Sequence, residues 1–215
     1  MSGTLVQGVV RGVSAPAYGD GEQSFGVTPR GETIVAQGLP PKTEVVRLGD
    51  SWTCQIATGS AFTHVANMPT TRAELALYNG EPGDGKCYVI DAVWWFCLTS
   101  ITAASGGTLI YQVAAAAAAP TDDPLQLINS PMGKTYGGRA KRAVAVTTMT
   151  ANKWAALASQ PAGAAVSIGV GVVAEARGGI VLPPGATLGL NVVVGTATGT
   201  GLIGLAWHEA KLRIS

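Results

Sequence analysis

Alternating hydrophobic and polar positions dominate the C-terminal part of the chain. Between residues 187 and 194, Leu188, Leu190, Val192 and Val194 share one parity, and Thr187, Gly189 and Asn191 take the other. This period of two is typical of a half-buried β-strand. The Pro183-Pro184-Gly185 sequence just before it follows a second apolar stretch, residues 180–182. Proline and glycine in this order predict a tight turn between two strands.

The last strand is predicted to bend. Ile203, Leu205 and Trp207 share one parity, whereas the apolar residues at 210, 212 and 214 have the opposite one. A slip of one residue turns the hydrophobic side chains of a strand to the other face of its sheet. We therefore expect a β-bulge near His208 and Glu209 to absorb the extra residue.

Similar patterns recur earlier in the chain. Residues 45–48 and 52–56 read as a hairpin around Gly49-Asp50, and residues 144–146 and 166–172 as further strands. Residues 87–99 are apolar on both faces apart from Asp91, with residues 108–113 as the expected hairpin partner. A strand with two apolar faces is covered on both sides, and the second face can be covered by another subunit.

The spacing of Thr150, Trp154, Ala155 and Ala158, with Pro161 after them, predicts a short helix.

About eight to ten short strands with glycine-rich turns predict an all-β fold. We expect an antiparallel β-sandwich or jelly roll, with an extended N-terminal arm and at most one or two short helices. The arm comprises residues 1–43, which are rich in glycine and proline, and the β domain comprises residues 44–215. The arm either contacts the domain or a neighbouring subunit, or is a frayed terminus. Residues 114–142 break the strand pattern and form an excursion that is mobile, packed on a neighbour or functional.

Composition narrows the possible functions. The chain has 215 residues, of which 47% are hydrophobic and 13% charged, and its net charge is +1. A surface with so few charges favours burial in an oligomer or larger assembly. The charge offers no general attraction to nucleic acid or to an anionic membrane. The longest uninterrupted apolar run, residues 92–98, is too short to cross a bilayer, and no secretory signal opens the chain.

The candidate chemical motifs are all incomplete. Three cysteines, Cys54, Cys87 and Cys97, form no metal pattern, and the last two lie roughly 33 Å apart if they share one strand. They are expected to be buried reduced thiols. Residues 80–86 have the spacing of a phosphate-binding loop, but Cys87 and a strand follow where a serine or threonine and a helix are required, so a connecting loop is preferred. The two histidines, His64 and His208, belong to no catalytic or zinc motif.

These motifs therefore do not predict an enzyme, a metal site or a bound cofactor. Acidic residues at 20, 22 and 84 are too sparse for calcium. The basic segment with Lys134, Arg139, Lys141 and Arg142 either contacts an acidic partner, or DNA weakly, or is a solvated loop.

The chain contains GVVRG, DGEQSF and RGETIV near the N-terminus, LYNGEPGDGK before the apolar strand, and GGIVLPPGATLGL with LIGLAWHEA near the end. Together these stretches resemble structural proteins of tailed bacteriophages. The resemblance implies a β-rich virion component, and similar jelly rolls decorate phage heads as trimers. It transfers no functional residue to this chain.

The function expected from this resemblance is a capsid decoration or cement protein. It would bind the major capsid protein or another virion protein, form a homotrimer, and reside in the virion after assembly in the host cytoplasm. No specific nucleic acid and no membrane is expected as a partner. The alternative is a receptor- or glycan-binding fibre or spike module on the head or tail.

The candidate interface residues come from three places. Trp94, Trp95 and Phe96 place large side chains on both faces of one strand. The others are Arg11 and Phe25 in the arm, and Arg139, Lys141 and Arg142 in the basic segment.

Overall fold

The computed structural model describes residues 45–46, 49–56, 61–99, 106–115, 127–128, 138–146, 149–150, 153–161, 169–195 and 199–212. The chain divides between Leu48 and Gly49, a few residues after the predicted boundary, and the part from Gly49 onward contains the strands. The arm, residues 1–43, lies outside the described residues and stays a prediction. The strands are β1 (Ser51–Gln55), β2 (Phe62–Thr63), β3 (Ala73–Asn79), β4 (Cys87–Cys97), β5 (Gly107–Ala115), β6 (Leu127–Ile128), β7 (Ala140–Val146), β8 (Ala155–Gln160), β9 (Gly171–Leu182), β10 (Ala186–Val194) and β11 (Thr200–Ala210).

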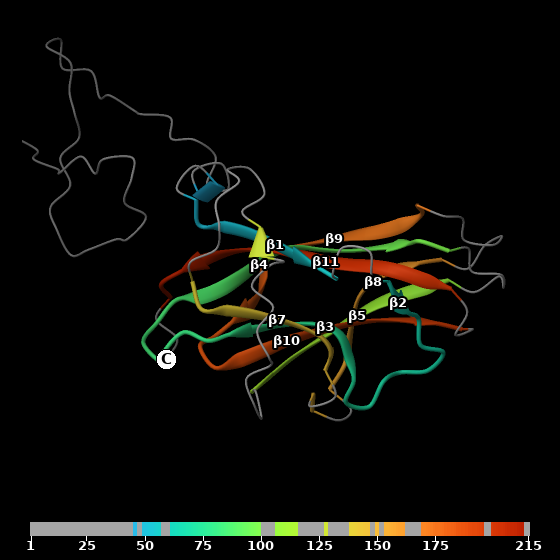
Figure 1. The fold of residues 1–215 in the computed structure, drawn as a ribbon, viewed down its shortest axis with the longest axis horizontal. Coiled ribbons are helices and arrows are strands. Elements are labelled where there is room, and N and C mark those ends of the chain that lie inside the picture. The colour runs from blue at the N-terminus through green and yellow to red at the C-terminus, as the bar shows by residue number, and fades with distance from the viewer. Residues whose placement is uncertain are drawn as a thin grey trace, which may run out of the picture. The chain divides into compact units, whose positions relative to one another are not determined.

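The strands form two antiparallel sheets that face each other (Figure 1). The first sheet has the order β6-β1-β11-β4-β9, with β2 also paired to β11, and the second has the order β7-β3-β10-β5-β8. The predicted all-β sandwich is confirmed.

The strand order is that of a jelly roll. Without the short strands β2 and β6 and the edge strand β7, eight strands remain. The first pairs with the last (β1 with β11), the second with the seventh (β3 with β10), the third with the sixth (β4 with β9) and the fourth with the fifth (β5 with β8). This nested pairing is one long antiparallel ribbon wound around a common core, which is how a jelly roll is built.

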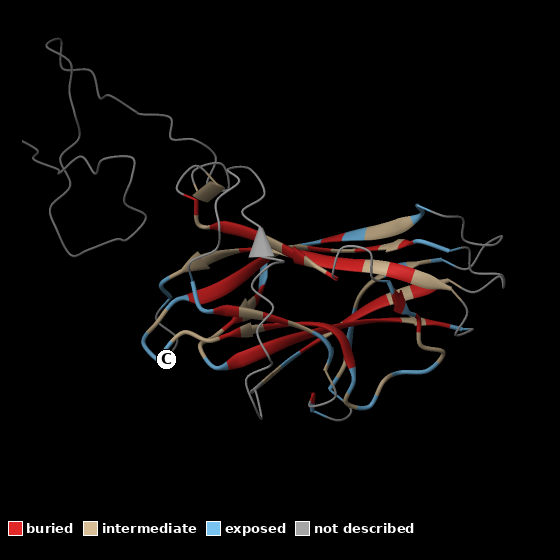
Figure 2. Ribbon diagram, viewed as in Figure 1, coloured by how far each residue is buried: buried red, intermediate tan, exposed pale blue. Residues whose placement is uncertain are grey.

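Large apolar side chains fill the space between the sheets. Figure 2 shows the buried residues on the strands of both sheets. Every second residue of β10, from Leu188 to Val194, points into this core, as the alternating sequence predicts. Two tryptophans of the first sheet, Trp95 and Trp207, are fully buried there. Cys54, Cys87 and Cys97 are free and buried, and the last two mark the opposite ends of β4, in agreement with the sequence.

The predicted turn at Pro183–Gly185 is confirmed, and it joins β9 of the first sheet to β10 of the second. The two predicted hairpins are wrong. β4 and β5 follow each other in the chain but lie in different sheets. Val45 and Val46 adopt a helical conformation, and β1 pairs with β11 and β6 instead. Hydrophobic alternation predicts a strand but not its partner. A strand shows the same alternation whether the next strand pairs with it in the same sheet or lies in the opposite sheet.

The predicted helix at residues 150–158 is also wrong. Residues 155–160 form β8, which pairs with β5 along the edge of the second sheet. Alanine favours a helix by propensity, but the hydrogen bonds offered by an open sheet edge outweigh that preference.

The predicted bulge exists, but in the neighbouring strand. The register shift between β4 and β11 falls between Ala206 and Trp207, and the unmatched residue is Asp91 of β4. β11 keeps its phase through Glu209, whose side chain is only 6% exposed and pairs with Lys86. A charged residue can occupy this inward position because a cation neutralises it, so the strand needs no slip.

Candidate contact surface

The outer side of the first sheet carries a group of apolar side chains around β4. Val93, Trp95 and Cys97 are buried in the core, whereas the intervening Trp94 and Phe96 point outward and are partly exposed. Trp94 lies beside Val173 of β9, and Phe96 lies beside Leu202 of β11. We call these four residues the outer apolar face. Val173 is 58% exposed, so the face is open to solvent.

Two glycines leave room for the aromatic rings of this face. Gly204 of β11 lies opposite Trp94, and a Cβ atom built on it would stand 2.5 Å from the indole ring. Gly171 of β9 lies opposite Phe96, and a Cβ there would stand 2.5 Å from the phenyl ring. Both rings therefore cover the backbone of a neighbouring strand, which makes the face broad and low. The role of these two glycines depends on the strand register. The sequence alone therefore did not predict that they, Val173 or Leu202 belong to this surface.

The outer side of the second sheet is covered by the chain itself. Gln112 of β5 donates to the carbonyl of Thr150 and accepts from its amide, both at 2.8 Å. Met149 packs on Gly189 of β10, and the Trp154 indole donates to the carbonyl of Thr70 at 3.3 Å. These contacts bury the polar outer positions of the second sheet, so the two outer surfaces of the sandwich differ.

The structure separates the predicted interface residues. Trp94 and Phe96 remain candidates, but Trp95 is buried in the core and cannot reach a partner. Arg142 is also buried and donates to the carbonyl of Gln55 at 2.5 Å, so it links β7 in one sheet to β1 in the other. Arg139 is exposed and Lys141 half-buried, and both have the opposite strand parity to the buried Arg142, so the three basic residues do not form one patch. Arg11, Phe25 and Lys134 lie outside the described residues.

His64 is part of the core. The Trp95 indole donates to its Nε2 at 3.0 Å, and the two rings meet edge to face at 5.4 Å between centroids. Because Nε2 accepts this hydrogen bond, the ring is neutral and carries its proton on Nδ1. His64 thus supports the position of Trp95.

His208 faces the bulge residue. Its Nδ1 lies 3.0 Å from Asp91 Oδ1, and Ser51 of β1 stands opposite it in the strand register. Serine, histidine and aspartate are the residue types of a hydrolytic triad. Within the described structure, however, no hydrogen bond joins Ser51 to His208, so the arrangement orients the imidazole without bringing a nucleophile to it.

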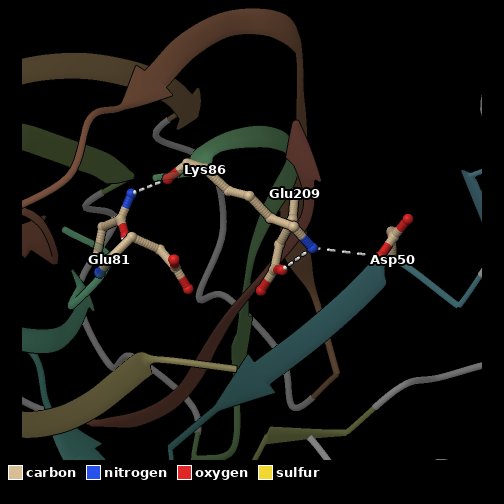
Figure 3. Close-up of polar contacts among 5 residues, drawn as sticks. Asp50, Glu81, Lys86 and Glu209 are labelled. Carbon is tan, nitrogen blue, oxygen red and sulfur yellow. Dashed lines mark hydrogen bonds and ion pairs between the residues drawn. The ribbon is translucent and has the colours of Figure 1, made fainter. Parts of the chain in front are cut away.

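The loop 80–86 ends in a group of charges (Figure 3). Lys86 Nζ lies 3.0 Å from Glu209 Oε2 and 3.7 Å from Asp50 Oδ1. Burial by itself would lower the pKa of Lys86, but the hydrogen bond to Glu209 and the charges of Glu209, Asp50 and Glu81 together raise it above the ordinary value. In this structure the Lys86 ammonium group therefore pairs with carboxylates.

A pocket of about 380 Å³ lies beside this loop. It is lined by Gly83, Asp84, Gly85, Cys87, Pro183, Pro184, Lys211 and Leu212. Asp84 and Lys211 carry opposite charges at its wall, so the pocket has no dominant charge. Among all the described residues, no group of three or more His, Cys, Asp or Glu could hold a metal ion.

The buried thiols lead to a prediction about reactivity and pH. Burial raises the pKa of Cys54 from 9.0 to about 12, against the opposing effect of the Arg142 charge. Because the thiolate is the reactive form, we expect no labelling of the folded protein by a thiol reagent at about pH 8, and three labelled thiols per chain in denaturant. Rapid labelling of Cys54 in the folded protein would contradict this.

The sign of the accompanying pH effect follows from the same shift. Between pH 9.0 and about 12 the unfolded chain loses the Cys54 proton and the folded protein keeps it. The free energy of unfolding therefore falls as the pH rises through this range. Urea midpoints at about pH 8 and about pH 10 measure the effect, with Cys54→Ser as the control that removes the thiol.

Comparison with protein-family models, curated proteins and solved structures finds no match to this chain. Within the described ranges, no helix has the length and apolar character needed to span a membrane.

Proposed function

We propose that the protein is a structural component of a bacteriophage virion, a capsid decoration or cement protein. It binds the head shell, through the major capsid protein or another virion protein, and stabilises the shell as an oligomer, with a homotrimer as the expected state. The role requires neither catalysis nor a cofactor.

The outer apolar face carries this proposal. A closed jelly roll already buries its core, and Trp94, Phe96 and Val173 lie outside it, while Leu202 is partly buried against it. Apolar groups gain about 25 cal/mol per Å² when a partner removes them from water. The low charge content, the jelly-roll connectivity and the similarity of the turn sequences to phage structural proteins support the same role.

Electron microscopy of the purified virion tests the proposal. We expect density that fits the Gly49–Ser215 body at symmetric positions on the outer surface of the head. Mass spectrometry of the same particles should give a copy number that matches the count of these positions. Density of this shape only on the tail or its fibres, or virions without the chain, would contradict the assignment.

A receptor- or glycan-binding module is the second candidate, because Trp94 and Phe96 together form a partly exposed aromatic surface on which a sugar ring can stack. This alternative predicts binding to a glycan array that is lost in Trp94→Ala. A decoration protein shows no such binding.

A further inference from the structure

At one end of the sandwich, the described segments around three strand connections contain no charged residue, and Arg72, which precedes β3 and pairs with Glu74, lies at the edge of this region. At this end, β4, β8 and β10 finish and β5, β9 and β11 begin. We call it the uncharged end, and it comprises the described residues 61–68, 96–99, 106–108, 159–161, 169–173, 193–195 and 199–202. No Asp, Glu, Lys or Arg occurs in any of these segments.

Backbone contacts hold these segments together. The Leu98 amide donates to the carbonyl of Thr200 at 2.9 Å, and the Gly169 amide donates to the carbonyl of Cys97 at 2.8 Å. Across the two sheets, Gly107 of β5 lies against the Trp95 ring. The uncharged end is therefore one continuous part of the surface.

The charges lie elsewhere because of how the chain is wound. Four long stretches, residues 53–71, 92–121, 154–174 and 178–208, are free of Asp, Glu, Lys and Arg. Each contains a connection between two strands at the uncharged end. The opposite end carries Asp50, Glu81, Asp84, Lys86, Glu209 and Lys211.

The uncharged end is continuous with the outer apolar face. Leu98 and Val170 are exposed next to Phe96, at the point where β4 and β9 meet this end. A soluble surface normally mixes charges of both signs, and an exposed apolar region without them marks a contact site.

We propose that the uncharged end and the adjoining outer apolar face bind a second copy of this chain. A charged partner group buried there would find no opposite charge, and an unpaired buried charge is costly. The partner surface must therefore be equally free of charge, and the same end of another copy meets that requirement. This inference rests on the proposed function, which includes a homo-oligomer, and it adds which surface forms that oligomer. The charged end of the sandwich then remains available for other contacts.

Sedimentation velocity of the full chain over a range of concentrations tests this, with a matched pair of variants. Leu98 at the uncharged end and Leu212 at the charged end are both 42% exposed. We expect Leu98→Glu to raise the dissociation constant for self-association at least about tenfold, which corresponds to about 1.4 kcal/mol. Leu212→Glu should associate like the unmodified protein, and added salt should not weaken the association, since no charges meet.

Two outcomes would overturn the proposal. One is an unmodified protein that stays monomeric up to about 100 μM, well above a micromolar affinity. The other is a Leu98→Glu variant that associates normally while Leu212→Glu dissociates, which would place the contact at the charged end. Co-sedimentation of the protein with phage heads is measured separately, so loss of self-association and loss of head binding are distinguishable.

A second pair keeps the test decisive if circular dichroism shows that Leu98→Glu is unfolded. Val173 on the outer apolar face is 58% exposed, and Val144 on β7 of the other sheet is 48% exposed. Val173→Glu should weaken association at least about tenfold and Val144→Glu should not. Equal behaviour of these two variants would overturn the proposed surface.

Discussion

Replacing Trp95 by alanine is expected to lower the free energy of unfolding by about 3–5 kcal/mol. The indole is fully buried, and it packs against Gly107 of the other sheet and against Gly201 of β11. Its removal leaves a cavity between the sheets and deprives His64 of the hydrogen bond at Nε2. A buried acceptor without its donor adds to the cost of the cavity.

Urea unfolding of Trp95→Ala beside Trp94→Ala measures this effect. The two tryptophans are adjacent in β4 but point to opposite sides of the sheet, so the pair compares the same change inside and outside the core. Trp94→Ala should cost about 1 kcal/mol in the monomer, because the ring is partly exposed. Equal losses in the two variants would show that Trp95 is not the core residue described here. Trp95→Phe separates the packing from the hydrogen bond, since it keeps a ring and lacks the N–H group.

Replacing Asn79 by aspartate is expected to cost about 2–4 kcal/mol at neutral pH. The Asn79 side chain is fully buried and donates to the carbonyls of Lys86 and Leu182, both at 2.9 Å. Its oxygen accepts from the Glu81 amide at 3.1 Å. Asn79 thereby ties the end of β3 to the start of β4 and the end of β9. A carboxylate of the same shape keeps the acceptor but turns both donors into repulsive contacts.

Asn191→Asp is the matched control for this change. Asn191 is equally buried, but its side-chain nitrogen donates to a single carbonyl, that of Arg72, at 3.0 Å. We therefore expect N191D to lose less stability than N79D. Both losses should be smaller at about pH 4 than at pH 7, because a protonated carboxyl group regains one donor. Urea midpoints at the two pH values provide the measurement, and an N79D variant as stable as the unmodified protein would refute the role of Asn79.

Sequence periodicity predicted the elements that are long and face one core. β10 follows its alternating residues, as β11 does through Glu209, and the Pro183–Gly185 turn lies where proline and glycine require it. β9 instead begins at Gly171, near the end of the strand expected at residues 166–172, and continues through residues 173–179, for which no strand was expected. Prediction failed at β8, where small residues carry little periodic signal and the pairing with β5 decides the conformation. It also failed at Trp95 and Arg142, which were assigned to an interface. Strand alternation shows that Trp94 and Trp95 face opposite sides, but not which side is the core.

The amino-acid sequence by itself determined the all-β class, the buried thiols and the clustering of charges into a few short stretches. The tertiary structure decided what those stretches mean. Nested pairing of β1 with β11, β3 with β10, β4 with β9 and β5 with β8 places alternate connections at opposite ends of the sandwich. Connections without charge therefore collect at one end, and Asp50, Lys86 and Glu209 meet at the other. Because antiparallel winding reverses the chain at every strand, segments far apart in the sequence share one surface, and only the register shows which residues form it.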